Sequence, residues 1–202
     1  MLESVVEITK KHGGYSYKGG RCGIHIHRSI GPFRMKANRV KLLRSLIAIE
    51  PFAYIVAQRT GVAVLGTDLL DVPRREYGSF VQIKRAVGEH GIGSDDPEAW
   101  ERAAINYCDE IGYEVEGMEF NRHGLNTVEI RIFRGTLNVD TIMAYLGFYH
   151  FLCEWALSVD ISKLLRWNHT TSWKNFAGFI KNHETEFSSH VLKYIESRGV
   201  IV

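Results

Sequence analysis

The sequence predicts an α+β fold in which helices pack on one face of a largely antiparallel sheet. Two stretches, 21–30 and 127–134, alternate apolar and polar residues with the period of a β-strand. Other stretches repeat apolar residues at helical spacing, and the most apolar of them begins after Asn138. A chain of 202 residues is long enough to bury a core of its own, so we expect a single domain over 1–202.

Composition and charge narrow the classes of function. Apolar, charged and aromatic contents of 45%, 24% and 11% are ordinary for a globular protein and do not favour disorder or a fibrous structure. A net charge of +2 is too small to indicate a nucleic-acid partner. Three cysteines, Cys22, Cys108 and Cys153, have long and irregular spacings, which favours reduced thiols in a cytoplasm over a disulfide framework.

The sequence contains no signal for a membrane or for secretion. No apolar run reaches the roughly 18 to 20 residues that a bilayer span requires. The first residues lack the basic and then apolar order of a secretory signal. We therefore expect a cytoplasmic protein without a membrane partner.

The N-terminal third predicts a short helix, a strand and a long interrupted helix. Residues 2–9 have helical spacing, and two glycines follow where a helix C-terminus is expected. The stretch 21–30 predicts a strand. Helical spacing returns over 37–58, and Pro51 within it predicts a kink or a break, because proline lacks the N–H that a helix interior needs.

The middle of the chain predicts a loop, a helix and a hairpin. Residues 59–96 contain many glycines and turn signals, which favours a long loop with short strands. A proline after Asp96 predicts the start of a helix that runs through Tyr107. The alternating stretches 113–120 and 127–134 lie on either side of a turn, which favours a β-hairpin at the centre of the sheet.

The C-terminal third predicts helices. The stretch after Asn138 is apolar around most of its circumference up to Leu157, which predicts a buried helix covering one face of the sheet. Further helices are expected at 161–167, 173–182 and 186–198.

Four residues on the two main predicted strands are candidates for chemistry. Side chains two apart on a strand share a face, so His25 and His27 project together. The same rule places Thr127, Glu129, Arg131 and Phe133 on one face, and Val128, Ile130 and Ile132 on the other. Charges within a Val/Ile strand are costly to desolvate unless they pair with each other, a metal or a ligand.

Simpler interpretations of these residues stay open. Glu129 and Arg131 would form ordinary cross-strand pairs on a solvent-exposed face. His25 and His27 would be polar residues on the wet face of an edge strand. Alternatively, both histidines would ligate zinc together with a third ligand, for which the candidates are His90, His123 and Glu129.

Two motifs carry a resemblance to a known family. Cys22-Gly-Ile-His-Ile-His27 and Thr127-Val-Glu-Ile-Arg-Ile-Phe-Arg-Gly-Thr-Leu137 resemble, in their order and separation, the two signature strands of the amidoligase family. That family belongs to the glutamine synthetase and glutamate–cysteine ligase-like superfamily. The resemblance covers roughly 1–155 as a glutamine synthetase-like catalytic core and leaves 156–202 as a C-terminal helical extension.

The resemblance implies a reaction, cofactors and partners. The reaction would be ATP-dependent coupling of a carboxylate to an amine, both small molecules or peptides, through an acyl phosphate. Charge on the transferring phosphoryl group calls for Mg²⁺ and fixed cationic donors. The cofactors implied are therefore Mg²⁺ and ATP, and the activity is that of a carboxylate-amine ligase.

The resemblance also implies roles for individual residues. His25 and Glu129 would hold the metal, Arg131 would contact the transferring phosphoryl group, and His27 would place phosphate or carboxylate. Arg134 is expected near the rim or in a structural pair. Thr136 and Asn138 are competing candidates for the cap of the following helix.

The chain departs from the family at one point. Members of the superfamily have an early strand with two acidic residues, whereas here a helix precedes Cys22 and carries Glu3 and Glu7 at i and i+4. Glu114 and Glu116 are possible substitutes on a strand-like segment. Otherwise a second chain supplies the missing strand, or the protein is an inactive member that binds or assembles. A zinc-dependent hydrolase is the third alternative.

Overall fold

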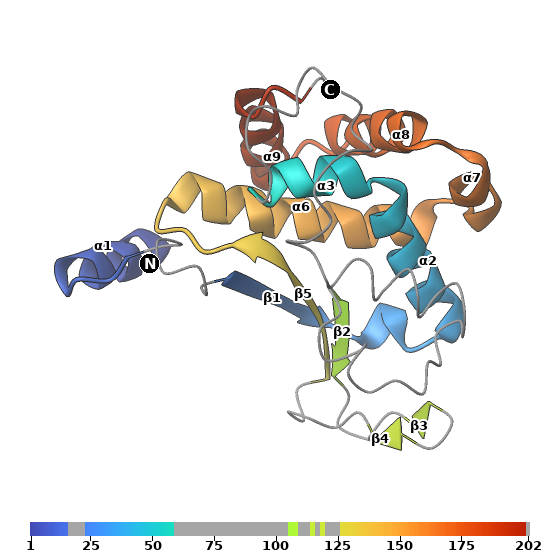
Figure 1. Ribbon diagram of the computed structural model, residues 1–202, viewed down its shortest axis with the longest axis horizontal. Coiled ribbons are helices and arrows are strands. Elements are labelled where there is room, and N and C mark those ends of the chain that lie inside the picture. Colours follow the sequence, from blue (N-terminus) through green and yellow to red (C-terminus); the bar gives the residue numbers. More distant parts are fainter. Residues whose placement is uncertain (16–22, 59–104, 109–113, 116–117, 120–125, 201–202) are drawn as a thin grey trace.

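The computed structural model describes residues 1–15, 23–58, 105–108, 114–115, 118–119 and 126–200 (Figure 1). The helices are α1 (Leu2–Lys11), α2 (Lys36–Ala48), α3 (Glu50–Val56), α6 (Val139–Ser158), α7 (Ile161–Arg166), α8 (His169–Lys181) and α9 (Glu186–Ser197). The strands are β1 (Gly23–Ser29), β2 (Ile105–Cys108), β3 (Glu114–Val115), β4 (Met118–Glu119) and β5 (Thr127–Arg134). None of these described helices has the length and apolar character needed to cross a membrane.

The main sheet has three strands in the order β1-β5-β2, and both pairings are antiparallel. Figure 1 shows β5 between β1 and β2, with α3, α6, α8 and α9 together on one side of the sheet. This arrangement confirms the expected α+β class, in which helices pack on one face of an antiparallel sheet.

α6 forms the centre of the helix layer. It is apolar around most of its surface, and Tyr145, Phe148 and Leu152 on it are fully buried. The Asn138 side chain accepts a hydrogen bond from the Thr141 N–H at 2.8 Å and caps its first turn. Asn138 is therefore the cap, and Thr136 instead accepts a hydrogen bond from the Asn138 N–H.

Close packing joins α6 to the C-terminal helices. A Cβ added at Gly147 would lie 2.5 Å from Val191 Cγ2 and 3.1 Å from the Phe187 carbonyl oxygen. Only glycine therefore allows α6 and α9 to approach this closely. On α8, Trp173 and Phe176 are buried in the same core.

Several expectations from local sequence are confirmed. α1 ends before Gly13, which adopts a φ of 79°. The helix expected over 37–58 is broken into α2 and α3 at Ile49, just before Pro51. The three C-terminal helices are present as α7, α8 and α9. α8 begins earlier than expected, because the Asn168 side chain caps the Thr171 N–H.

Two expectations for the middle of the chain are wrong. The helix expected through Tyr107 is replaced there by β2, whose pairing with β5 overrides the helical spacing of the segment. The hairpin between 113–120 and 127–134 does not form, because β3 pairs with β4. β5 pairs with β1 on one edge and β2 on the other, so no edge remains for a further strand. The expected loop over 59–96 lies outside the described residues.

Candidate functional site

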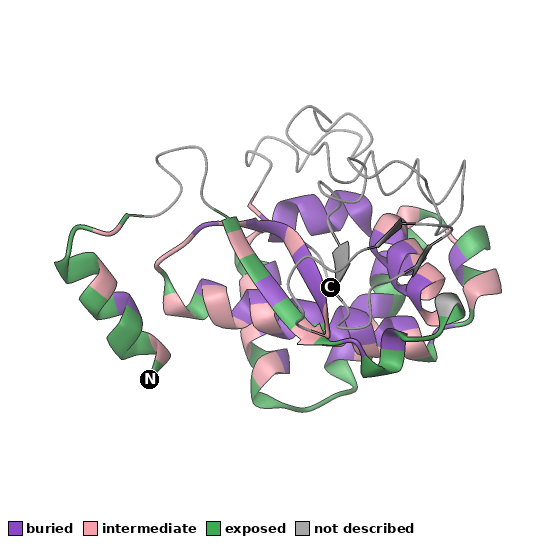
Figure 2. Ribbon diagram, turned by 90° about the horizontal axis from the view of Figure 1, so that it is seen from below, coloured by how far each residue is buried: buried purple, intermediate pink, exposed green. Residues whose placement is uncertain are grey.

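The two histidines of β1 lie on the face of the sheet that is turned away from α6. His25 and His27 are exposed, whereas Ile26 between them is buried in the core. Figure 2 shows this alternation of exposed and buried residues along β1. On the opposite face Arg28 reaches α6, where it donates hydrogen bonds to Glu154 Oε1 and to the His150 carbonyl oxygen. This contact fixes β1 on the helix layer.

Glu129 on β5 stands directly opposite His27 in the strand register. Its Oε1 lies 2.8 Å from His25 Nδ1 and 3.6 Å from His27 Nε2. The carboxylate side chain is 10% exposed, whereas those of His25 and His27 are 45% and 36% exposed. A largely buried anion is thus covered by two accessible imidazoles. This partnership offsets much of the cost of burying a charge in the strand.

Thr127 orients the second histidine. Its Oγ1 lies 3.0 Å from His27 Nδ1, so the other ring nitrogen, Nε2, points toward Glu129. Either ring tautomer satisfies this contact, because a hydroxyl both donates and accepts. Sequence alone placed Thr127 on the correct face but assigned it no role. A hydroxyl two residues before a strand carboxylate was the available signal.

A β-bulge in β5 changes the face of the residues that follow it. His27 pairs with Glu129 and Ile26 with Ile130, but Ile24 pairs with Phe133, so β5 has one extra residue in this interval. Phe133 consequently stacks on Tyr145 of α6, with ring centroids 4.4 Å apart. The expectation that Phe133 shares a face with Glu129 is wrong, because strict alternation does not continue through a bulge.

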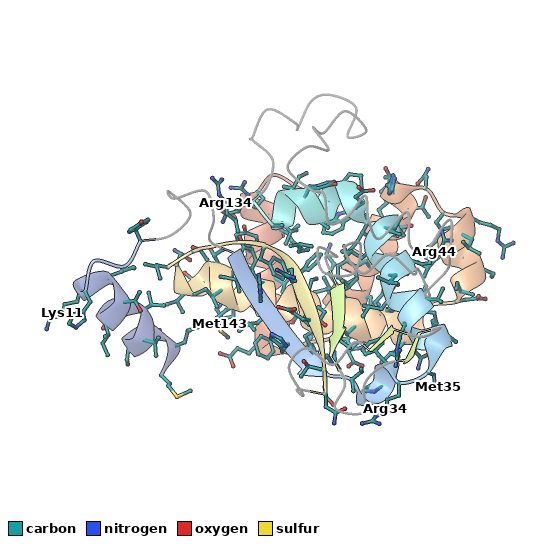
Figure 3. The ribbon with its side chains drawn as sticks, turned by 60° about the horizontal axis from the view of Figure 1, so that its bottom comes forward. Lys11, Arg34, Met35, Arg44, Arg134 and Met143 are labelled. Carbon is teal, nitrogen blue, oxygen red and sulfur yellow. The ribbon has the colours of Figure 1, made fainter. Side chains whose placement is uncertain are left out.

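The two arginines of β5 differ in their surroundings. Arg131 lies within the bulged interval of the strand and is partly buried. Arg134 lies at the far end, where its backbone N–H donates to the Ala57 carbonyl oxygen at 3.1 Å. Its guanidinium Nη1 is 3.5 Å from the Gln58 carbonyl oxygen, as expected for a structural position. Figure 3 shows Arg134 and Arg34 at opposite ends of the β1–β5 pair.

β2 adds a residue that the sequence did not indicate. Asn106 is paired in register with Glu129 on the edge of β5 that is opposite β1. Glu129 is therefore paired with His27 of β1 on one edge of β5 and with Asn106 of β2 on the other edge. The wrong assignment of this segment to a helix concealed the relationship.

The side chains at the site include only some of the ligands that a divalent cation requires. Mg²⁺ in enzymes is commonly held by one or two carboxylates, with substrate phosphates and waters completing its shell. Glu129 provides one such carboxylate. In the described part of the chain, no group of three or more His, Cys, Asp and Glu has the geometry of a metal site. The other candidate ligands, His90, His123 and Glu116, lie outside the described residues.

Comparison with known proteins gave no relative. No family model, curated protein or solved structure matches this chain.

Proposed function

We propose that the protein is an ATP-dependent carboxylate-amine ligase with a glutamine synthetase-like core, similar to the amidoligase family. The observation that carries the proposal is the convergence of His25, His27 and Glu129 on one sheet face, around a single carboxylate oxygen. These residues belong to the two motifs on which the resemblance rests. Arg131 follows Glu129 by two positions on the same strand.

The proposed reaction has two steps. A substrate carboxylate oxygen attacks the γ-phosphorus of ATP, and the bond to the ADP oxygen breaks. An amine then attacks the acyl carbon of the acyl phosphate, phosphate leaves, and the amine loses a proton. The product is an amide or isopeptide bond. Positioning and electrostatic stabilisation carry most of the catalysis in phosphoryl transfer of this kind.

Each residue has a stated role in this proposal. Glu129, with His25, would hold Mg²⁺, which supplies positive charge to the nucleotide phosphates. Arg131 would donate to the transferring phosphoryl oxygens. His27, whose ring is oriented by Thr127, would place the substrate carboxylate or a phosphate oxygen.

A thermal-shift titration with Mg·ATP tests the proposal. Binding to the native state raises the melting temperature by mass action. We expect a saturable rise for the wild type and none for Glu129→Gln, which keeps the size of the side chain and removes its charge. Glu196→Gln on the exposed face of α9 is the matched control and should behave as the wild type does. Absence of any shift in the wild type would favour an inactive binding or assembly protein.

Chemistry is tested separately by trapping. Hydroxylamine converts an acyl phosphate to a hydroxamate, so a carboxylate substrate should give hydroxamate and ADP in equal amounts. Arg131→Ala should fold normally and abolish this reaction. An unchanged rate in Arg131→Ala removes Arg131 from the mechanism.

A zinc-dependent hydrolase is a second candidate by ligand type alone, because the described residues do not hold these three groups in the geometry of a metal site. Two imidazoles and one carboxylate are a ligand set of catalytic zinc, with the remaining position left for water. Metal analysis of the purified protein distinguishes the two candidates. Stoichiometric zinc that is lost in Glu129→Gln supports the hydrolase and contradicts a Mg·ATP site.

A further inference from the structure

Three helices carry an excess of positive charge that the net charge of the chain conceals. α2, α7 and α8 together contain eight of the 25 lysines and arginines and none of the 23 aspartates and glutamates. The eight are Lys36, Arg39, Lys41 and Arg44 on α2, Lys163 and Arg166 on α7, and Lys174 and Lys181 on α8. The rest of the chain has an excess of acidic residues, which reduces the net charge to +2.

These helices lie together at one end of the molecule. α2 contacts both α7 and α8. His169 Nδ1, in the first turn of α8, lies 3.0 Å from the carbonyl oxygen of Ala48 at the end of α2. Trp167 and Asn168 alone separate α7 from α8 in the chain. Figure 1 shows α7 at one end of the long axis and α1 at the other, and Figure 3 shows Arg44 at the same end as α7.

Four of the cations form what we call the basic surface. Lys163, Arg166 and Lys174 are exposed, and Arg44 is partly exposed. Among the described residues, no ion pair joins any of these four side chains to a carboxylate. The Arg166 guanidinium donates to the carbonyl oxygen and hydroxyl of Ser162, which leaves its charge uncompensated.

Asp160 is an acidic residue at the border of the basic surface. Its carboxylate accepts a hydrogen bond from the Ser162 N–H at 2.8 Å and so caps α7. Lys163 and Arg166 attract this carboxylate electrostatically but form no ion pair with it. One exposed carboxylate does not neutralise four cations, so this border residue leaves the surface positive.

Neutral hydrogen-bonding groups accompany the cations on α8. Thr170, Thr171 and Asn175 are exposed there. The Asn175 Oδ1 accepts from Trp155 Nε1 at 2.9 Å, so its amide N–H groups are the part of the side chain that can serve a partner. Hydroxyl and amide side chains commonly contact the phosphate oxygens of nucleic acids alongside lysine and arginine.

The same helices lack the apolar surface that other anionic partners require. The apolar residues of α8, including Trp173, Phe176 and Ile180, are buried in the core and cannot enter a lipid surface as an interfacial helix does. Leu165 is the exposed large apolar side chain on the three helices. Protein interfaces are centred on buried aromatic or apolar anchors and are depleted in lysine. A phosphate backbone, which is read through charge, requires no such anchor.

We propose that the basic surface binds the phosphate backbone of a nucleic acid without regard to base sequence. Arg44, Lys163, Arg166 and Lys174 would neutralise phosphates, and the neighbouring threonine and asparagine side chains would donate to phosphate oxygens. This inference goes beyond the proposed ligase function and does not depend on it. The ligase residues lie on β1 and β5, whereas the basic surface lies on helices.

Fluorescence anisotropy with a labelled DNA duplex of mixed sequence tests the inference. The full chain is titrated without nucleotide at several salt concentrations. If four phosphates are neutralised, the logarithm of the binding constant should fall with the logarithm of the salt concentration with a slope of about −3 to −4. A wild type that does not bind the duplex at about 50 mM salt overturns the inference.

Two double variants of equal charge locate the binding surface. Lys163→Gln with Lys174→Gln should weaken binding at least about tenfold at 0.1 M salt and make the slope less steep by about 2. Lys10→Gln with Lys11→Gln, on the exposed face of α1 at the other end of the molecule, should bind as the wild type does. Equal losses in both would mean that overall charge alone acts, which overturns the basic surface.

Single variants keep this test independent of folding. Exposed lysines contribute little to stability, so both double variants should keep the wild-type circular dichroism spectrum. If the variant at Lys163 and Lys174 does not fold, each single substitution should make the slope less steep by about 1. An unchanged slope in both single variants overturns the inference.

Other anionic partners and the proposed function are separated by further arms. Binding to phosphatidylserine vesicles or to polyglutamate, at the same salt concentration and as tight as to the duplex, overturns a nucleic acid as the partner. The variant at Lys163 and Lys174 should keep the thermal shift with Mg·ATP. A wild type that shifts with Mg·ATP but does not bind the duplex leaves only the ligase proposal standing, and duplex binding without a shift does the reverse.

Discussion

His27 and Thr127 contact each other across the β1–β5 pair, with 3.0 Å between Nδ1 and Oγ1. The contact directs the other ring nitrogen of His27 toward Glu129. The contact joins the exposed ring of His27 to Thr127, which is not part of the buried core. The hydroxyl thus sets the orientation of a candidate functional group at little cost to the fold.

Replacing Thr127 with valine should free the His27 ring. The substitution keeps the β-branched shape, so we expect a loss of at most about 1 kcal/mol in the free energy of unfolding. The ring nitrogen resonances of His27 in a ¹H–¹⁵N NMR spectrum should change, and the thermal shift with Mg·ATP should decrease. Thr127→Ser keeps the hydroxyl and should restore both. Unchanged His27 resonances in Thr127→Val would contradict the role of Thr127.

Breaking the contact between Arg28 and Glu154 should loosen β1 from α6. Glu154→Ala leaves a half-buried guanidinium without its carboxylate, which we expect to cost about 1–3 kcal/mol in unfolding free energy. The double variant Arg28→Met with Glu154→Ala should recover part of this loss. Urea denaturation of both single variants and the double variant measures the coupling energy. Strictly additive losses would show that the pair contributes nothing.

The thiol of Cys153 should resist alkylation in the native protein. Burial raises the pKa of Cys153 to about 12, more than the nearby Arg28 guanidinium lowers it. The thiolate is the reactive form, and the side chain has no exposed surface. Iodoacetamide at pH 8, followed by mass mapping of the peptide that contains Cys153, should find label only after unfolding. Comparable labelling rates in the native and unfolded protein would refute this prediction.

Protonation of His150 should destabilise the fold. Burial, and then the charge of Arg28, lower the pKa of His150 below its ordinary value of 6.5, against the opposite effect of Glu154. The unfolded chain therefore takes up this proton first, and stability falls as the pH is lowered from 6.5 toward the folded pKa. In His150→Gln, the free energy of unfolding should depend less steeply on pH in this interval. The control His12→Gln, at the exposed end of α1, should retain the wild-type slope.

Truncating Phe133 should be among the most destabilising changes in β5. Phe133 has no exposed surface and contacts both Tyr145 and Phe148 of α6. Phe133→Ala should cost about 3–5 kcal/mol, because it removes a buried ring and leaves a cavity. Phe133→Leu should cost less. A loss below about 0.5 kcal/mol in Phe133→Ala would mean a surface position and would contradict the bulge.

Local sequence predicted the elements that local forces determine. The break before Pro51 and the apolar surface of α6 each depend on residues within a few positions, as does the N-terminal cap of α6, for which the sequence left Thr136 and Asn138 in competition. The site residues His25, His27 and Glu129 were predicted to lie on strands, and both imidazoles lie within 3.6 Å of the Glu129 carboxylate. The alternation of apolar and polar residues, together with the two motifs, was sufficient to predict this placement.

Sequence patterns missed what long-range pairing determines. The bulge opposite His25 exists because β1 and β5 must satisfy both their hydrogen bonds and the packing of Phe133 on α6. β2 is a strand because β5 offers it an edge, although its own residues have helical spacing. The position of Asn106 beside Glu129 follows from that pairing alone.

The site is divided between two strands that are distant in the chain. His27 and Thr127 are 100 positions apart, and their contact requires closure of the whole intervening segment. Such contacts form slowly, because the entropy of loop closure is lost before the strands gain any hydrogen bonds. A chain in which only the C-terminal helices α6 to α9 had formed would have a core but would lack the candidate site. The candidate site therefore forms only when β1 joins β5, and its formation reports on the completion of folding.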